Sequence, residues 1–339
     1  MGGRRKKKFH LKRPKGEKSS NPTAAGSSSS TPPPWIELPR DVTAYILHRL
    51  GTVEILENVQ KVCTTWRSVC REPSIWRVID MKLSDGGLKI FGDADIMCRR
   101  AVDRSQGELI DINIKDFGTD DLLRYISDRS CHLKRLKLVC CHYISGSGLT
   151  TAVKKFPELE ELHLFFMPLI HAGDIETISM SCPMLKSLTF NIRGYMFPEV
   201  DIDDSYALTV AKSMPNVRHL RLFGNKLSDE GLRAILVGCP HLELLDLRQC
   251  FNVYLRGDLG KRCFRQIKEV RTPTASTADY EWDDYAEEDD DIYSPGDYGD
   301  LEDYEDYEYY ENYDDYTNPF NDLPYPANLV WYMDQDGYL

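Results

Sequence analysis

Apolar residues recur in a fixed frame through the middle of the chain. Six phrases carry apolar side chains at their first, fourth and sixth positions: "LIDINI" from Leu109, "LKRLKL" from Leu133, "LEELHL" from Leu159, "LKSLTF" from Leu185, "VRHLRL" from Val217 and "LELLDL" from Leu242. Because side chains alternate along a strand, this spacing is typical of a strand with one buried face. The phrases begin 24, 26, 26, 32 and 25 residues apart, and the longest interval contains the insertion "YMFPEVDIDDSY".

Helical patterns fill the intervals between these phrases. "DEGLRAILVGC", from Asp229, places Leu232, Ile235 and Leu236 on one face of a helix. A single strand-and-helix unit cannot bury its own apolar edge, so consecutive units must stack. The sequence therefore predicts an α/β solenoid of about six repeats over residues 107–271, with parallel strands on the concave face and helices on the convex face.

A different pattern occupies residues 35–80. Val42, Ile46 and Leu50 recur at helical spacing, and a second helical series covers residues 55–66 before Pro73 interrupts the pattern. This predicts three short helices, which are too few to bury their apolar surface well without help. We expect the module to complete its core on a neighbour, either as a cap on the solenoid or by docking. Residues 81–106 are predicted to contain a linker helix, through the stretch "ADIMCRRAVDRSQGELI".

Charge is distributed very unevenly along the chain. Residues 1–18 hold nine Lys or Arg, whereas residues 272–339 hold 22 Asp or Glu and no basic residue, so the net charge of −12 divides into −22 and +10. We expect a disordered basic, Ser- and Pro-rich arm over 1–34 and a disordered acidic, tyrosine-rich tail over 272–339. The runs "RRKKK" and "KRPK" resemble nuclear import signals, so the expected location is the nucleus, the cytoplasm or both.

Few features indicate chemistry. The ten cysteines include no CxxC pair, and the basic start leads into a Ser- and Pro-rich stretch, so we expect no secretory signal and free thiols that act as small apolar residues. The sequence has no P-loop, GxSxG or HExxH motif, and we predict no catalytic site, metal or cofactor. We also expect no membrane span, and no nucleic-acid partner because the basic arm lacks interleaved aromatic residues.

The motifs resemble two known modules. The repeats resemble leucine-rich repeats of the cysteine-containing type, with Cys141, Asn225 and Cys250 where that family turns the chain off the strand. Residues 35–80 resemble an F-box, through "LP" at Leu38, "IL" at Ile46, and the "VC..W" and "P..W" pairs that follow. The combination looks most like plant F-box proteins with leucine-rich repeats, of the Skp-interacting-partner type.

This resemblance implies a non-catalytic substrate receptor of a Skp, cullin and F-box ubiquitin ligase. The F-box would dock on the Skp adaptor and through it reach the cullin, while the repeats would bind target proteins. The implied adaptor-face residues are Leu38, Pro39, Ile46, Leu47 and Leu50. A second set either joins that face or holds the helices together: Val62, Cys63, Trp66 and Trp76.

Side chains between the buried leucines should point to the concave side, where targets would bind. The candidate substrate-binding residues there are Arg135, Lys137, His163, Phe165, His219, Arg221 and Phe223. Exposed aromatics at Phe165 and Phe223 would suit a protein-binding face, although the insertion covering them or a register shift of one residue are alternatives. The alternative function is a nuclear acidic-tail leucine-rich-repeat protein that binds histones or other basic proteins, which leaves residues 35–80 unexplained.

Overall fold

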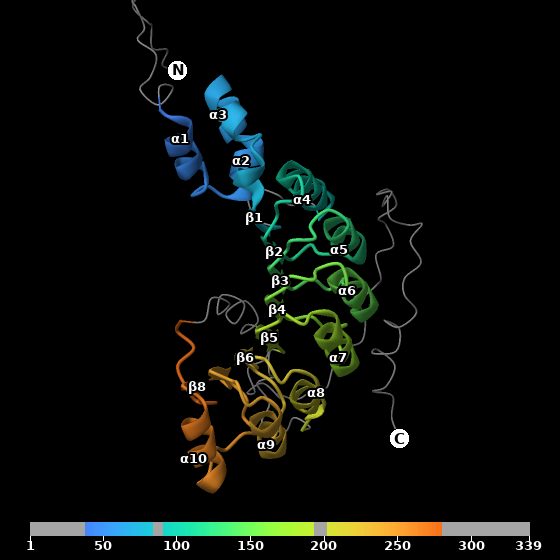
Figure 1. Cartoon of the computed structure of the whole chain (residues 1–339), viewed down its shortest axis with the longest axis vertical. Helices are drawn as coiled ribbons and strands as arrows, with labels where there is room; N and C mark the ends of the chain where they lie inside the picture. The colour runs from blue at the N-terminus through green and yellow to red at the C-terminus, as the bar shows by residue number, and fades with distance from the viewer. Residues whose placement is uncertain (1–37, 84–90, 193–201, 280–339) are drawn as a thin grey trace, which may run out of the picture. The chain divides into compact units, whose positions relative to one another are not determined.

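The computed structural model describes residues 38–83, 91–192 and 202–279 and shows a row of strands with helices on one side (Figure 1). The strands are β1 (Val78–Lys82), β2 (Asp111–Lys115), β3 (Arg135–Val139), β4 (Glu161–Phe165), β5 (Ser187–Asn191), β6 (His219–Arg221), β7 (Leu244–Asp246) and β8 (Glu269–Arg271). They pair in chain order, and every pair is parallel. The predicted α/β solenoid is confirmed.

The helices between the strands cover one face of the sheet. They are α4 (Phe91–Ser105), α5 (Asp120–Ser127), α6 (Gly146–Val153), α7 (Ala172–Ser181), α8 (Ser205–Ser213), α9 (Asp229–Gly238) and α10 (Gly257–Gln266). In α9 the residues that the spacing placed on one face, Leu232, Ile235 and Leu236, are all buried. We call the sheet face away from these helices the concave face.

Two strands were not predicted by the leucine frame. Before and within β1, the phrase "WRVIDM" puts Trp76, Ile79 and Met81 in the three buried positions. At β8, the phrase "IKEVR" uses Ile267 and Val270 for the first two positions. Tryptophan, isoleucine and methionine replace leucine in these phrases. The sheet therefore has eight strands in the described residues, not about six.

The predicted linker is part of the solenoid. The boundary predicted at residue 80 falls inside β1, and α4 packs against α5 as the helix of the first repeat. The helix ends at Ser105, because Gln106 and Gly107 take up left-handed backbone angles, with φ of 50° and 90°. Among the described residues of 81–106, the predicted linker helix is therefore α4, the helix of the first repeat.

The C-terminal boundary also differs from the prediction. Residues from 272 onward were predicted to be tail, but the Pro273 carbonyl accepts a hydrogen bond from the Gln249 N–H at 2.9 Å. The Ser276 carbonyl accepts another from Arg248 Nη1 at 3.1 Å. The first residues of the predicted tail therefore pack on the last repeats. The predicted basic arm and the rest of the tail lie outside the described residues.

Between residue 38 and β1 the structure has three α-helices, as predicted. They are α1 (Arg40–Leu47), α2 (Thr52–Glu57) and α3 (Thr64–Val69), with 3-10 turns η2 (Val59–Lys61) and η3 (Pro73–Trp76). The second apolar series is divided between α2 and α3 because Cys63 is extended, with φ of −158°. The Cys63 Sγ accepts a hydrogen bond from the Trp66 N–H at 3.4 Å and so caps α3.

This module covers the open edge of the sheet at β1. The Thr52 hydroxyl at the start of α2 accepts a hydrogen bond from the Asp80 N–H at 3.1 Å, which satisfies a donor on the edge strand. Trp76 is buried, and its Nε1 donates to the Cys70 carbonyl at 2.9 Å. Because Trp76 also holds the first buried position of the β1 phrase, one side chain belongs to both cores.

Aspartates at the starts of α5 and α8 bond to the next repeat. The Asp120 carboxylate accepts hydrogen bonds from the Ser145 N–H at 2.8 Å and hydroxyl at 2.6 Å. Asp204 repeats the arrangement with Ser228, at 2.7 Å for both bonds. Gly148 leaves room for it, since a Cβ there would overlap the Asp120 carboxylate. These contacts set the stacking of neighbouring repeats.

Cysteine and asparagine side chains hold the turns after the strands. The thiol of Cys250 donates to the Leu222 carbonyl at 2.8 Å, and that of Cys141 to the Ile114 carbonyl at 3.5 Å. Asn225 Nδ2 donates to the Phe190 carbonyl of β5 at 2.7 Å. Burial raises the pKa of Cys141 to about 12, so this thiol stays protonated. The cysteines of these turns are structural, as the sequence predicted.

Candidate functional site

The outward side of α1 is the first candidate binding surface. Thr43 and Leu47 face the core and are fully buried, whereas Val42 and Tyr45 are 40% and 61% exposed. Ile46 is half-buried. This eight-residue helix therefore has apolar side chains on both sides, and on the outer side Arg49 Cζ lies 4.7 Å from the centre of the Tyr45 ring. Tyr45 was not predicted, although the run "AYIL" is apolar on every side of the helix.

The five residues predicted for the adaptor face divide between surface and core. Pro39 is exposed, while Leu38 and Ile46 are half-buried. Leu50 is partly buried and packs against the main core. Leu47 was placed on the wrong side of the helix, because its side chain is fully buried in that core. The surface available on α1 therefore comes from Val42, Tyr45 and Ile46, together with Leu38 and Pro39, which immediately precede the helix.

The second predicted set is also divided. Val62 is 51% exposed and lies on the surface between η2 and α3. Cys63 caps α3, and Trp66 packs against the core from a partly buried position. Trp76 lies within the core. Cys63, Trp66 and Trp76 therefore hold the helices together, and Val62 alone in this set is an exposed apolar side chain.

The sheet register brings four predicted concave-face residues together. Arg135 and Lys137 on β3 lie opposite Glu161 and His163 on β4, and Phe165 ends the same strand. Arg135 Nη2 forms an ion pair with the Asp111 carboxylate of β2 at 2.9 Å. Lys137 Nζ lies 5.5 Å from the centre of the Phe165 ring, a cation–π distance. The polar side chains of this group lie on one side of β3 and β4, above the Phe165 ring.

His163 sits in a hydrogen-bonded position on this surface. Its Nδ1 is 2.8 Å from the Thr189 hydroxyl, and its Nε2 is 3.3 Å from Glu161 Oε2. The hydrogen bond from His163 holds the pKa of Glu161 below its ordinary value, against the opposing effect of burial. The histidine is therefore fixed between two strands and is not a loose surface side chain.

The two aromatic residues predicted on the concave face are buried. Phe165 and Phe223 are 4% and 5% exposed, so they are not exposed aromatics. The alternative, cover by the insertion before Ala207, falls largely on residues 193–201, which lie outside the described residues. The register itself is as predicted, since Phe165 pairs with Val139 and alternates with the buried Leu164. A basic side chain lies over each ring. Lys137 lies over Phe165, and Arg248 lies over Phe223 with its Cζ 5.6 Å from the ring centre.

The remaining predicted residues lie on β6, separated from the first group by β5. His219 and Arg221 are half-buried, and Arg221 Nη1 lies 3.4 Å from the Ser187 hydroxyl, a long hydrogen bond. The concave-side residues of β5, Ser187, Thr189 and Asn191, are small, polar and buried. The predicted residues of β3 and β4 are thus separated from those of β6 by the buried polar side chains of β5.

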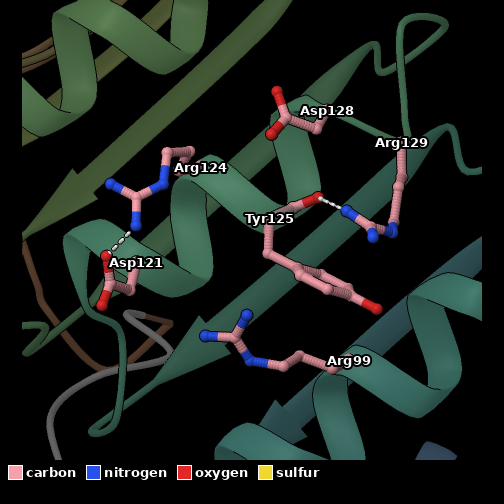
Figure 2. A pocket seen from close by; sticks show the side chains of 6 residues that line it. All are labelled: Arg99, Asp121, Arg124, Tyr125, Asp128 and Arg129. Carbon is pink, nitrogen blue, oxygen red and sulfur yellow. Dashed lines mark hydrogen bonds and ion pairs between the residues drawn. The ribbon is translucent and has the colours of Figure 1, made fainter.

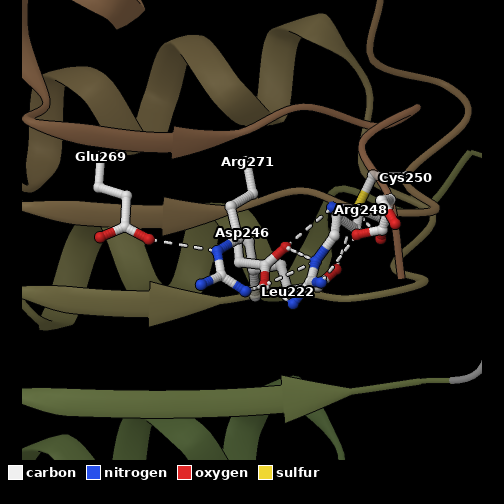
Figure 3. A network of polar contacts seen from close by, with 7 residues as sticks. Leu222, Asp246, Arg248, Cys250, Glu269 and Arg271 are labelled. Carbon is white, nitrogen blue, oxygen red and sulfur yellow. Dashed lines mark hydrogen bonds and ion pairs between the residues drawn. The ribbon is translucent and has the colours of Figure 1, made fainter. Parts of the chain in front are cut away.

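A buried ion pair on the concave face was not predicted as part of the site. Figure 3 shows Asp246 beside Arg248, which donates to its carboxylate from Nη2 at 2.7 Å and from Nε at 3.0 Å. The side chains are only 1% and 3% exposed. Arg271 approaches the same carboxylate at 4.0 Å and donates to Glu269. The sequence placed Asp246 and Arg248 on one face, but did not show that they pair.

The helical side carries a polar hollow of about 200 Å³ between α4 and α5 (Figure 2). Tyr125 lies between the guanidinium groups of Arg99 and Arg129, which are 4.6 and 3.6 Å from its ring centre. Each of the three arginines that line the hollow has a carboxylate partner: Arg99 has Asp95, Arg124 has Asp121, and Arg129 has Asp103. The Tyr125 hydroxyl donates to Asp103 Oδ1 at 2.7 Å, so the polar groups of the hollow are engaged with one another.

The described ranges are residues 38–83, 91–192 and 202–279. In these ranges no group of three or more His, Cys, Asp or Glu side chains is placed to hold a metal ion. Within the same ranges, no helix combines the length and apolar character needed to cross a membrane.

Comparison with known proteins agrees with both modules. The F-box-like family model matches residues 35–82, and the Leucine Rich repeat model matches residues 129–151 and 213–236. F-box protein SKIP19 of Arabidopsis thaliana is 49% identical over 263 residues, which cover 78% of this chain and 84% of that protein. F-box/LRR-repeat protein 23 of the same plant is 50% identical over 71% of this chain, which spans only 54% of that longer relative. With an F-box-like module in front of the repeats and relatives of this kind, the chain belongs to the family of F-box proteins with leucine-rich repeats.

Proposed function

We propose that this protein is the substrate-recognition subunit of a Skp-cullin-F-box ubiquitin ligase. Its F-box docks on the Skp adaptor, and through it on the cullin, while its repeats bind target proteins for ubiquitination and degradation. The outward face of α1 carries this proposal, because Val42 and Tyr45 are exposed apolar side chains on a helix whose other face already fills the core. A folded module rarely leaves such a face without a partner.

The concave face is the proposed surface for targets. It combines charged side chains at Arg135, Lys137 and Arg221 with His163 and His219, all carried on rigid neighbouring strands. Side chains on adjacent strands are held at fixed spacing, so such a face recognises an extended surface of another protein.

The link between the two modules supports a receptor role. Trp76 belongs to both cores, and the Thr52 hydroxyl holds the edge of β1, so a target on the sheet keeps a defined distance from the adaptor. A stiff connection raises the effective concentration of the target near the transferring enzyme. The chain itself supplies binding surfaces, and other subunits carry out the transfer of ubiquitin.

The nuclear histone-binding alternative rests on the acidic tail, nearly all of which lies outside the described residues. It gives no role to the apolar face of α1. For the ubiquitin-ligase subunit we also propose a location in the nucleus, the cytoplasm or both. Imaging a fluorescent fusion with and without residues 1–18 tests this location.

Co-purification with the Skp adaptor tests the proposed function. The variant carries Val42→Asp and Tyr45→Asp, and the control carries Val237→Asp, which changes an apolar residue on α9 that is more exposed than either of them. Both variants should fold, since neither position is in the core. The wild type and the control should retain the adaptor, and the α1 variant should lose it. Retention by all three, or by none, would reject the proposal.

A further inference from the structure

Four arginines meet where the F-box packs on the first repeat. Arg67 and Arg71 are four residues apart on α3 and the turn after it, and Arg100 and Arg104 have the same spacing on α4. Gln60 joins the two pairs, since its carbonyl accepts from Arg67 Nε and its Oε1 from Arg104 Nη2, both at 3.0 Å. We call these four residues the junction arginines.

No described carboxylate forms an ion pair with a junction arginine. Their neighbours differ in this respect, because Arg99 on the same helix pairs with Asp95. The Arg104 guanidinium lies 5.1 Å from the centre of the Trp76 ring, and its Nη1 is buried with no hydrogen-bond partner among the described residues.

The local electrostatics are unfavourable for these cations. Burial lowers the pKa of Arg104, and the nearby charges of Arg71 and Arg100 lower it further, although Cys70 acts in the opposite direction. Like charges at a spacing of four residues on a helix repel each other. The cluster therefore costs stability in the isolated chain, and an anion bound there would remove that cost.

The surroundings favour a protein surface as the source of that anion. Arg67, Arg71 and Arg100 are exposed and lie on α3, on the turn after it and on α4, so they face an open surface. The exposed apolar residue Val62 lies between η2 and α3, next to Lys61 and close in sequence to Arg67. An apolar centre with a charged rim is the usual anatomy of a protein–protein interface, and the guanidinium fork suits carboxylates.

We propose that the junction arginines bind a carboxylate-rich surface of the ligase subunit on which the F-box docks. The inference rests on the proposed function, since it names a second contact with the same partner. The apolar face of α1 supplies affinity, and the junction arginines steer the encounter and fix its orientation.

The test measures association of the full chain with the purified adaptor subunit, by biolayer interferometry over a range of salt. The test variant carries R67E, R71E and R100E, and it leaves Arg104 in place because that residue contacts Trp76. The control variant carries K154E, R256E and R265E, which reverse three exposed cations of the solenoid. Circular dichroism confirms that both variants fold.

We expect the test variant to associate about tenfold more slowly than the wild type at about 0.05 M salt, and the control to match the wild type. The difference should shrink as salt rises to about 0.5 M, because exposed charges are then screened. Equal rates for wild type and test variant would overturn the inference and leave the proposed function intact. No binding by the wild type would overturn both.

Discussion

Replacing Trp76 with phenylalanine tests whether the F-box and the first repeat share one core. The substitution removes the indole N–H that donates to the Cys70 carbonyl at 2.9 Å. That carbonyl would then lack its donor in a buried setting, which costs about 1–3 kcal/mol. The smaller ring also leaves a cavity, which adds about 1 kcal/mol, so we expect a loss of about 2–4 kcal/mol in the free energy of unfolding.

Hydrogen exchange measured by mass spectrometry shows where that loss falls. If Trp76 joins the two modules, W76F should reduce protection in peptides from α2 and α3 and also in those from β1 and α4. The control is Phe156→Leu, a fully buried change in the solenoid beyond α6, which should affect only the neighbouring repeats. Faster exchange in the F-box helices alone, with β1 and α4 unchanged, would refute the shared core.

Three further outcomes follow from the contacts of the solenoid. Asp246→Asn removes the charged partner from the buried ion pair of Figure 3 and should lower stability to urea by about 3–5 kcal/mol, whereas a loss below about 1 kcal/mol would contradict a tightly coupled pair. Gly148→Ala should push Asp120 off the next repeat and cost about 1–3 kcal/mol, while Gly173→Ala, which meets no atom, should be neutral or stabilising by up to about 1 kcal/mol. Iodoacetamide at pH 8 should label exposed Cys131 in the folded protein and spare the thiols whose pKa burial raises, and rapid labelling of those thiols would show that the repeats open readily.

The sequence was sufficient for the solenoid because its signal repeats. Six phrases shared the same three apolar positions, and all six became parallel strands. The first and last strands were missed because Trp76 and Ile267 stand where the other phrases have leucine or valine. Trp76 was assigned to the F-box motif alone, and so its second role at the start of a repeat was not recognised.

The surfaces were harder to predict than the fold. The apolar run in α1 did not show which side faces the core, and so Leu47 was assigned outward while Tyr45 was missed. On the concave face the register gave the correct side for Phe165, but it did not show that Phe165 and Phe223 are buried. Alternation along a strand determines the direction of a side chain, whereas exposure depends on what packs over it.

Hydrogen exchange of the full chain with and without saturating Skp adaptor tests the central claim most directly. We predict slower exchange at α1 and at the turn containing Val62, with α9 and α10 unchanged. Unchanged exchange at α1 under saturating adaptor, or slowing confined to strands of the concave face, would contradict docking through the F-box.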